Sequence, residues 1–430
     1  MTQHPTPYRI VVEGIDGVGK TTLISALRDA LATRRSVLTG TMAPITLDLF
    51  KAYGRDMAGD PQKYWTEVSR RTKTQVFLTE GVARAEYLAQ EHAAYDVLVH
   101  DRWWQTFHAY TEDPADFDHR CRFLKDALPH VDLVLYLRGD VAACAARLVA
   151  MDDWLVLQTG EDRVADFLQV LQDRYDEVFA GDPAVITIDV ADLSQDAVAA
   201  LVVEEVTSRL PARRPSSRPP GAYPTTRTTF GHPSPEALCA VEGVDGAGKS
   251  TLVHAVAASA RTTVARLASA SLRLFKSSVP EAPDGSSGIR AAFEDEFRHQ
   301  TYLVDGLVGL SCLAEDTGPW LFDRWFPLFA IYQDAITTDR PFFDYLLSRF
   351  PTPAHLYYLD LEPADALARL RDRGDWMPAT LGDEGTLDVL AGMRERHRPR
   401  LLAAGPRVTV LDARRSPDDL AEVVGAEVRG

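Results

Sequence analysis

Two glycine-rich segments of this chain carry residue types that bind phosphate groups. The first reads Gly14-Ile15-Asp16-Gly17-Val18-Gly19-Lys20-Thr21-Thr22, and an almost identical run begins 229 residues later, at Gly243. Glycines let successive backbone N–H groups turn inward around phosphate oxygens, and a following helix N-terminus adds a positive dipole. We expect Lys20 to reach the β- and γ-phosphates and Thr21 to ligate Mg²⁺. The sequence therefore predicts two sites for the phosphates of ATP or GTP.

The second segment supplies the same groups in the same order. Its candidate phosphate-binding residues are Gly243, Asp245, Gly246, Gly248, Lys249, Ser250 and Thr251, which match Gly14, Asp16, Gly17, Gly19, Lys20, Thr21 and Thr22 of the first. Each segment follows an apolar run and opens into an apolar-patterned helix, the strand, loop and helix context of a Walker A motif. The alternative, a glycine-rich turn that binds nothing, is disfavoured because the whole motif occurs twice.

Composition and charge narrow the class of protein. A chain of 430 residues is long enough for two or three domains with cores of their own. The net charge of −16 argues against a general nucleic-acid binder but allows a local basic pocket for phosphates. Cysteines stand at 121, 144, 239 and 312 with no CxxC spacing, so neither a disulfide framework nor a zinc site is indicated. No signal peptide is apparent, and no apolar run reaches the ~20 residues of a membrane span, so we expect a cytoplasmic protein that binds no membrane.

A repeat of long period divides the chain. Asp101-Arg102-Trp103 recurs as Asp323-Arg324-Trp325, and Asp153-Trp154 recurs as Asp375-Trp376, each pair 222 residues apart. Such a period indicates duplicated domains rather than a solenoid of short units. Between the copies lies a stretch rich in Pro, Ser, Thr and Arg that we expect to be extended and poorly ordered. The predicted parts are a first domain at 1–209, a linker at 210–236 and a second domain at 237–430.

Apolar runs of strand length alternate with helical patterns in both halves. The predicted strands are 10–12, 37–38, 96–100, 131–137 and 185–188 in the first half, then 238–241, 320–322, 355–359 and 408–411 in the second. This alternation indicates a parallel sheet covered on both faces, with ligands beyond the carboxyl ends of the strands. The predicted fold class is α/β, with two P-loop NTPase domains that are each a parallel sheet flanked by helices.

These motifs resemble those of the thymidylate kinase family of nucleoside-monophosphate kinases. Segments 13–22 and 242–251 are similar to the family's Glu-Gly-x-Asp-Gly-x-Gly-Lys-[Ser/Thr]-Thr loop, and both Asp-Arg pairs match its Asp-Arg-aromatic motif. The run Arg369-Leu-Arg-Asp-Arg-Gly374 resembles its arginine-rich lid, and Asp166-Phe167 with Tyr175 resembles its post-lid helix. The resemblance covers nearly all of both halves outside the linker. It implies phosphoryl transfer from ATP to a nucleoside monophosphate, most simply dTMP to dTDP.

Phosphoryl transfer needs positioning and charge neutralisation more than covalent chemistry, which gives each candidate a role. The expected catalytic residues are Lys20, Asp101, Arg102, Lys249, Asp323, Arg324, Arg371 and Arg373. The expected Mg²⁺ ligands are Thr21, Asp101, Ser250 and Asp323, and Arg147 and Arg369 are expected to contact ATP. The alternatives are a structural Asp-Arg pair at a strand end and, for the alternating arginines, a solvated helix face.

Recognition of the acceptor is expected to differ between the halves. The candidate acceptor-binding residues are Asp16, Lys51, Phe77, Arg84, Arg102, Thr106 and Tyr110. Asp16 resembles the family position that contacts the acceptor sugar, with a turn-forming Asp as the alternative. At the 222-residue offset, Arg84 corresponds to Gly306 and Thr106 to Leu328, so the second half lacks both contacts. Lys51 and Lys276 each follow a phenylalanine and are candidates for the acceptor phosphate or for a solvated surface.

Neither half matches the family pattern completely. The family's Arg-Glu-Pro segment after the second strand is missing from both, and the lid positions Arg371 and Arg373 correspond to Val149 and Met151 in the first half. Open alternatives are therefore a kinase for another nucleotide, a nucleoside or a small metabolite, or a regulatory nucleotide-binding protein with one degenerate domain. We favour specialised halves, the first being the nucleoside-monophosphate kinase. Intramolecular domain pairing and a homodimer both stay open.

Overall fold

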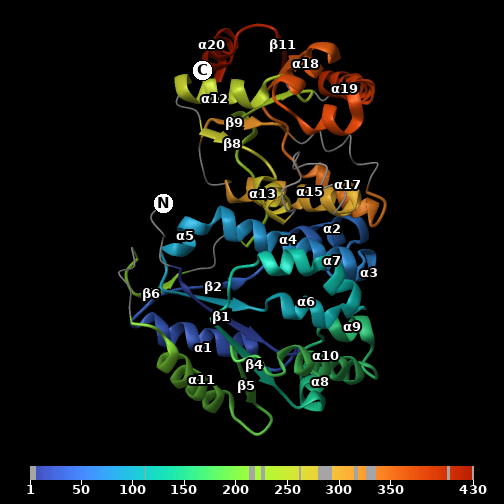
Figure 1. Cartoon of the computed structure of the whole chain (residues 1–430). Helices are drawn as coiled ribbons and strands as arrows, with labels where there is room; N and C mark the ends of the chain where they lie inside the picture. Colours follow the sequence, from blue (N-terminus) through green and yellow to red (C-terminus); the bar gives the residue numbers. More distant parts are fainter. Residues whose placement is uncertain are drawn as a thin grey trace. The chain divides into compact units, whose positions relative to one another are not determined.

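Parallel β-sheets form the centre of both halves of the chain. The structure is a computed structural model that describes residues 6–111, 113–212, 218–223, 228–260, 263–278, 293–313, 318–325, 336–403 and 407–428. It divides into unit 1, Met1–Thr229, and unit 2, Phe230–Gly430. Both units have helices packed around a sheet, and the strand pairs of the described residues are all parallel (Figure 1). The predicted α/β fold class with two parallel sheets is confirmed.

The sheet of unit 1 has β1 at its centre. Its strands are β1 Tyr8–Glu13, β2 Ser36–Thr41, β3 Val97–Asp101, β4 Leu133–Arg138, β5 Val185–Asp189 and β6 Gly221–Tyr223, in the order β5-β4-β1-β3-β2-β6. Ile10, Val11 and Val12 are fully buried, as a strand covered on both faces requires. Strands β1 and β3 end together, with Val12 paired to Asp101. The loop after β1 and the Asp-Arg pair after β3 therefore meet at one edge of the sheet.

Helices cover both faces of this sheet. Figure 1 shows α1 and α11 on one side and α4 and α7 on the other. The helices are α1 Lys20–Ala32, α2 Pro44–Ala58, α3 Tyr64–Glu67, α4 Arg70–Tyr87, α5 Ala89–Ala93, α6 Trp104–Tyr110, α7 Pro114–Ala127, α8 Val141–Ala150, α9 Trp154–Thr159, α10 Val164–Phe179 and α11 Gln195–Arg209. Ser69 caps α4 by accepting a hydrogen bond from the Thr72 N–H, which sets the start of a helix that carries several candidate residues.

Part of the segment expected to be a linker belongs to the sheet of unit 1. Strand β6 pairs with β2 in parallel, with Ser36 opposite Gly221. The Gly221 N–H donates to the Arg35 carbonyl at 2.8 Å, and the Arg218 guanidinium lies 4.6 Å from the centre of the Tyr95 ring. Residues 213–217 and 224–227 of this segment lie outside the described residues. Because β6 protects the edge of β2, unit 1 extends past the expected boundary at 209.

Unit 2 repeats the strand order of the first five strands of unit 1. Its strands are β7 Leu238–Gly243, β8 Thr263–Ala265, β9 Trp320–Asp323, β10 His355–Asp360 and β11 Arg407–Asp412, in the order β11-β10-β7-β9-β8. Its helices are the 3₁₀ turn Pro235–Ala237, α12 Lys249–Ala260, α13 Ser269–Ser278, α15 Asp295–Cys312, α17 Arg340–Ser348, α18 Pro363–Asp372, α19 Trp376–Ala403 and α20 Pro417–Val428. Gly382 interrupts α19 with φ 66. Within the described part of the chain, no helix is both long and apolar enough to cross a membrane.

Candidate functional site

The loop between β1 and α1 has the geometry of an anion-binding cradle. Gly14, Gly17 and Gly19 all have positive φ, at 140, 78 and 106. A Cβ on Gly14 would lie 2.5 Å from the Leu137 carbonyl oxygen, whereas a Cβ on Gly19 would meet nothing within 4 Å. Gly19 caps α1, so the first N–H groups of that helix face the loop. This geometry suits an anion held by backbone N–H groups and the helix dipole.

Lys20 lies folded along the inside of this loop. Its Nζ donates to the Gly14 carbonyl at 2.9 Å and to the Ile15 carbonyl at 2.8 Å, and the side chain is buried. Burial, with the nearby charge of Arg102, lowers the pKa of Lys20 to about 8. The ammonium is therefore charged at neutral pH and positioned at the cradle.

Asp16 joins the loop to the end of β3. Arg102 has φ 71, and its N–H donates to the Val12 carbonyl at 3.1 Å, which turns the side chain back toward the loop. The Arg102 guanidinium and the Tyr110 hydroxyl both donate to the Asp16 carboxylate. Burial opposes ionisation of Asp16, but Arg102, Lys20 and the Tyr110 hydrogen bond lower its pKa below the ordinary value. Three of the expected acceptor residues thus form one charged cluster.

A buried carboxylate, Glu13, forms hydrogen bonds to residues next to this cluster. Glu13 accepts hydrogen bonds from the Trp103 N–H at 2.6 Å and from the Thr106 hydroxyl at 2.7 Å. The Thr106 oxygen also lies 2.8 Å from the Tyr175 hydroxyl oxygen. Burial raises the pKa of Glu13. Thr106 therefore ties α6 to β1 and α10, a role that its sequence position alone did not indicate.

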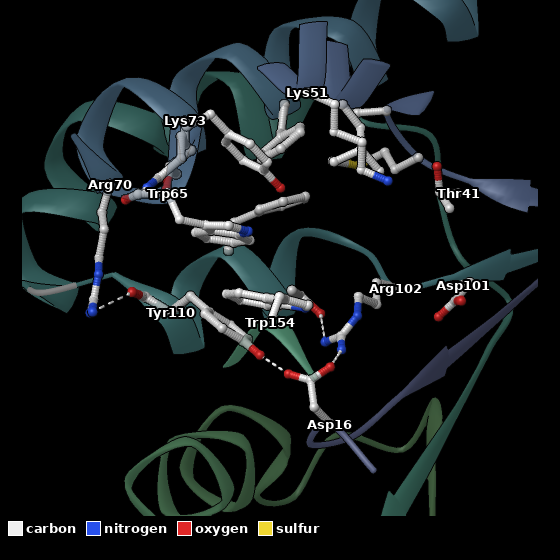
Figure 2. A pocket seen from close by; sticks show the side chains of 18 of the residues that line it. Asp16, Thr41, Lys51, Trp65, Arg70, Lys73, Asp101, Arg102, Tyr110 and Trp154 are labelled. Atoms are coloured by element: carbon white, nitrogen blue, oxygen red, sulfur yellow. Dashed lines mark hydrogen bonds and ion pairs between the residues drawn. The ribbon is translucent and has the colours of Figure 1, made fainter. Parts of the chain in front are cut away.

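A cavity of about 340 Å³ opens beside the Asp16 cluster (Figure 2). Its charged lining residues are Lys51, Arg70, Lys73, Arg102, Asp16 and Asp101, and its aromatic lining residues are Tyr64, Trp65, Phe77, Phe107, Tyr110 and Trp154. Four basic groups against two acidic ones favour an anion, and the aromatic walls favour a flat ring. The cavity therefore suits a ligand that combines a phosphate with an aromatic base.

Several lining residues were not among the sequence candidates. Arg70 and Lys73 share one face of α4 with the candidate Phe77 at helical spacing, and this pattern was the signal available for them. Trp65 had no comparable signal, because α3 has only four residues. Trp154 was marked by the recurrence of Asp153-Trp154 later in the chain, but that recurrence did not place it at a cavity. Only the tertiary structure brings these two indoles together.

The residues expected to bind Mg²⁺ fit that ion. Thr21 and Asp101 line a second cavity of about 430 Å³, which Lys51 also borders. The Asp101 Oδ1 atom is buried and has no hydrogen-bond partner among the described residues. Within the described segments, no cluster of three or more His, Cys, Asp or Glu side chains is present, so further ligands would come from phosphate and water. A hydroxyl and a carboxylate beside a phosphate cradle form a donor set that Mg²⁺ accepts.

Three other candidates, Arg147, Thr22 and Arg84, do not line either of these two cavities. Arg147 donates to the Gly17 carbonyl at 2.6 Å and therefore contacts the loop. Thr22 is exposed on α1. Arg84 does not line the aromatic cavity; its Nε lies 3.8 Å from Glu80 Oε1, and it borders a separate small cavity with His92. The role expected for Arg84 in acceptor binding has no support from this position.

The loop of unit 2 has the same construction. Gly243, Gly246 and Gly248 have φ 150, 84 and 97. Lys249 Nζ donates to the Gly243 and Val244 carbonyls, at 2.8 Å each. Burial lowers the pKa of Lys249. This loop therefore has the geometry of a second cradle suited to an anion.

The groups at the end of β9 complete that cradle. Arg324 has φ 79 and donates to Asp245 inside the loop, whose pKa lies below its ordinary value. Burial opposes ionisation of Asp245, but Arg324 and Lys249 outweigh it. The Ser250 hydroxyl donates to Asp323 Oδ2 at 2.6 Å. Asp323 Oδ1 is buried and has no hydrogen-bond partner in the described part of the chain. Ser250 and Asp323 therefore also fit Mg²⁺, while Thr251 is exposed.

Of the three arginines of the expected lid, Arg369 donates hydrogen bonds to the second loop. The charge of Arg373 is close enough to help lower the pKa of Asp245 in that loop. Arg369 Nη1 lies 3.4 Å from the Gly246 carbonyl oxygen and 3.3 Å from that of Ala247. Arg371 forms an ion pair with Asp383 and Arg373 forms one with Asp375, and these two arginine side chains are 54% and 64% exposed. Both point to acidic neighbours on the surface, as in the solvated-face alternative.

The second unit differs most on the acceptor side. Glu80 accepts from the N–H groups of Ile45 and Thr46 at the start of α2, and Asp305 accepts from the Ser271 N–H near the start of α13. These matching contacts align α4 with α15 at an offset of 225, so Arg84 corresponds to Gly309 and not to Gly306. The constant offset of 222 fails here because connection lengths differ between the units. Lys276 is exposed, and Leu328 lies outside the described residues.

The match to a family model lies in the first unit. Residues 12–201 match the family model for thymidylate kinase. A stretch of 152 residues is 34% identical to the thymidylate kinase of Xanthomonas euvesicatoria pv. vesicatoria (strain 85-10), covering 32% of this chain and 62% of that protein. A stretch of 204 residues is 28% identical to the probable thymidylate kinase of Pyrobaculum aerophilum, covering 45% of this chain and 98% of that protein. The chain thus spans less than two thirds of the Xanthomonas relative.

Two solved structures are similar to part of the chain at low sequence identity. One is a deoxyadenosine kinase from M. mycoides, with 18% identity and a TM-score of 0.34 over 46% of this chain and 99% of that chain. The other is a thymidylate kinase from Candida albicans, with 19% identity and a TM-score of 0.35 over 47% of this chain and 92% of that chain.

Proposed function

We propose that unit 1 is a nucleoside-monophosphate kinase that uses ATP and Mg²⁺, with dTMP as the first acceptor to test. The observation that carries this proposal is the position of Asp16. It belongs to the phosphate loop, yet it holds Arg102 and Tyr110 at the wall of the aromatic cavity. Donor cradle and acceptor cavity therefore share one charged cluster, as transfer between two bound phosphates requires. The family match over residues 12–201 supports the same reaction.

Different residues of unit 1 would bind the donor phosphates, the Mg²⁺ ion and the acceptor in such a reaction. Lys20 and the loop N–H groups would hold the β- and γ-phosphates of ATP. Thr21 and Asp101 would hold Mg²⁺, which neutralises charge on the transferred phosphoryl group when bound. Arg102 and Lys51 are basic residues that line the aromatic cavity. They would hold the acceptor phosphate. The base would then lie against the aromatic walls.

Unit 2 is proposed to bind ATP and Mg²⁺ and to act on a different acceptor. Its loop, Lys249, Ser250 and Asp323 repeat the donor site of unit 1. Lys276 is exposed, whereas Lys51 lines both cavities of unit 1. A regulatory unit that binds ATP without transfer is the second candidate, favoured by the acidic partners of Arg371 and Arg373.

Two loop variants of the full chain test the assignment. ADP formation is measured with ATP, Mg²⁺ and a panel of nucleosides and nucleoside monophosphates. Lys20→Ala is expected to abolish phosphorylation of dTMP, because it removes the charge at the cradle, and Lys249→Ala is expected to leave it largely intact. Loss of dTMP phosphorylation in Lys249→Ala alone would transfer the activity to unit 2. A wild-type chain that phosphorylates no acceptor in the panel would refute the kinase assignment.

A further inference from the structure

One wall of the aromatic cavity comes from a distant part of unit 1. Every other lining residue lies between 16 and 110, whereas Trp154 is the first residue of α9. Asp153 caps that helix by accepting from the Leu155 N–H at 2.9 Å, and Asp152 before it has φ 50. These two residues form a sharp turn after α8. The turn sets the direction in which the Trp154 side chain leaves the backbone. The indole is therefore held over the cavity by local structure.

Trp154 packs on a second tryptophan, Trp65, which comes from a distant part of the sequence. Its ring stacks on Trp65, with centroids 4.4 Å apart and an interplanar angle of 5°. Trp65 is itself fixed, because Lys73 Nζ donates to its carbonyl at 2.6 Å and lies 4.6 Å from its ring centre. Figure 2 shows the two indoles at the cavity together with Lys73. This stack continues the aromatic wall that starts at Tyr64, whose ring lies 5.1 Å from that of Trp65.

The segment that carries Trp154 is also packed against the phosphate loop. Arg147 contacts the Gly17 carbonyl, and a Cβ on Gly17 would lie 2.8 Å from the Cys144 carbonyl oxygen and 3.3 Å from Leu148 Cγ. Helix α8 therefore has no room to shift toward the loop. Because α8 and α9 are joined by a short capped turn, the position of Trp154 is set relative to the donor cradle as well as to Trp65.

We propose that Trp154 is an acceptor-recognition residue, against which the aromatic base of a nucleoside monophosphate packs while Arg102 and Lys51 hold the phosphate. Trp65 is its positioning residue. This inference rests on the proposed kinase function and narrows it, because it selects acceptors with an aromatic base over sugar phosphates and other small metabolites. Stacking tolerates different bases, so Trp154 contributes affinity more than discrimination among bases.

The test compares Trp154→Ala and Trp154→Phe in the full chain, with Trp104→Ala as the matched control. Trp104 packs against Phe117 and Lys125 and does not line the cavity. Binding of dTMP is measured by titration calorimetry, and KM and kcat are measured for dTMP and ATP. We expect Trp154→Ala to weaken dTMP binding about 5- to 100-fold, the range for loss of one base stack, with the KM for ATP changed less than about 2-fold. Trp154→Phe should recover most of the affinity.

Variants of Trp65 test the positioning role. Trp65→Ala should raise the KM for dTMP in the same direction as Trp154→Ala, and Trp65→Phe should restore it. Unchanged dTMP affinity in Trp154→Ala, or an equal loss of dTMP and ATP affinity, would overturn the proposal while leaving the kinase function standing. A loss of the same size in Trp104→Ala would also overturn it. Failure of the wild-type chain to phosphorylate any nucleoside monophosphate would instead refute the function on which it rests.

Discussion

Arg102 and Asp16 are 86 residues apart in the sequence, yet they form a charged hydrogen bond between the end of β3 and the interior of the phosphate loop. The Arg102 backbone adopts the left-handed region, with φ 71, which is unfavourable for an arginine by about 1–2 kcal/mol. Arg324 adopts φ 79 and bonds to Asp245 in the same way in unit 2. The presence of this strained backbone in both units supports a functional role for the pair.

Substitution of Asp16 tests whether the Asp16–Arg102 pair contributes to binding and phosphorylation of the acceptor. Asp16→Asn keeps the shape of the side chain but removes the charge that holds Arg102 at the cavity. We expect kcat/KM for dTMP to fall about 10- to 100-fold, with a smaller effect on the KM for ATP, because Arg102 lines the acceptor cavity. Steady-state kinetics with each substrate varied in turn measures this. Arg122→Ala, at an exposed ion pair on α7, is the control; a defect confined to ATP would place the pair on the donor side.

Lys51 and Lys276 form a natural pair for comparison. Lys51 lines both cavities of unit 1, whereas Lys276 is exposed on α13. Lys51→Ala should raise the KM for dTMP about 10- to 150-fold, because one charge-assisted contact to a phosphate is worth about 1.5–3 kcal/mol. Lys276→Ala should leave dTMP phosphorylation unchanged. Equal effects of the two substitutions on dTMP kinetics would refute the role of Lys51 at the acceptor phosphate.

Glycine at position 17 is required by both conformation and space. Gly17 has φ 78, and a Cβ there would lie 2.8 Å from the Cys144 carbonyl oxygen. Gly17→Ala should therefore lower the free energy of unfolding by about 1–2 kcal/mol of backbone strain plus about 1–3 kcal/mol of overpacking. It should also weaken ATP binding, since the loop must open to relieve the clash. Chemical denaturation and nucleotide titration measure the two effects.

Gly59 provides the control for that substitution. It caps α2 with φ 73, but a Cβ there meets nothing within 4 Å. Gly59→Ala should show only the backbone strain and leave ATP binding intact. Equal destabilisation by the two substitutions would mean that the packing of α8 against the loop contributes nothing.

His92 gives unit 1 a dependence of stability on pH. Burial, with the charges of Arg84 and Arg9, lowers the pKa of His92 to about 4. The folded state therefore keeps His92 neutral, while an unfolded histidine takes up a proton below its ordinary pKa of about 6.5. The unfolded state therefore binds more protons than the folded state between pH 6.5 and pH 4. As a result, the free energy of unfolding is highest above pH 6.5 and decreases as the pH falls toward 4. The temperature midpoint of unfolding should drop between pH 7 and pH 5.

Two glutamine variants identify the source of that drop. His92→Gln removes the titrating group and should reduce the decrease in unfolding temperature between pH 7 and pH 5. His119→Gln, on the exposed face of α7, should leave the decrease as in the wild type. A wild-type slope in His92→Gln would assign the acid sensitivity to other groups.

The sequence alone was enough to predict the α/β class and the backbone turns of the two glycine-rich loops. Short-range constraints explain this success: Gly14, Gly17 and Gly19 need positive φ, Lys20 must follow them, and a strand buried on both faces must read as an apolar run such as Ile10 to Val12. The Asp-Arg pair after β3 was also visible, because the carboxyl ends of β1 and β3 share one edge of a parallel sheet.

The acceptor side was decided by tertiary structure. Arg84 and the cavity residues Lys73 and Phe77 lie on one helix, and their spacing could not tell which turn of α4 faces the cavity. The Trp65–Trp154 stack depends on a capped turn after α8 and on a four-residue helix, neither of which has a periodic signal. Residues 221–223 read as linker because a short strand at a sheet edge gains its stability from pairing with β2 and not from its own composition. Contacts between segments distant in the chain, rather than local patterns, thus shape the acceptor cavity.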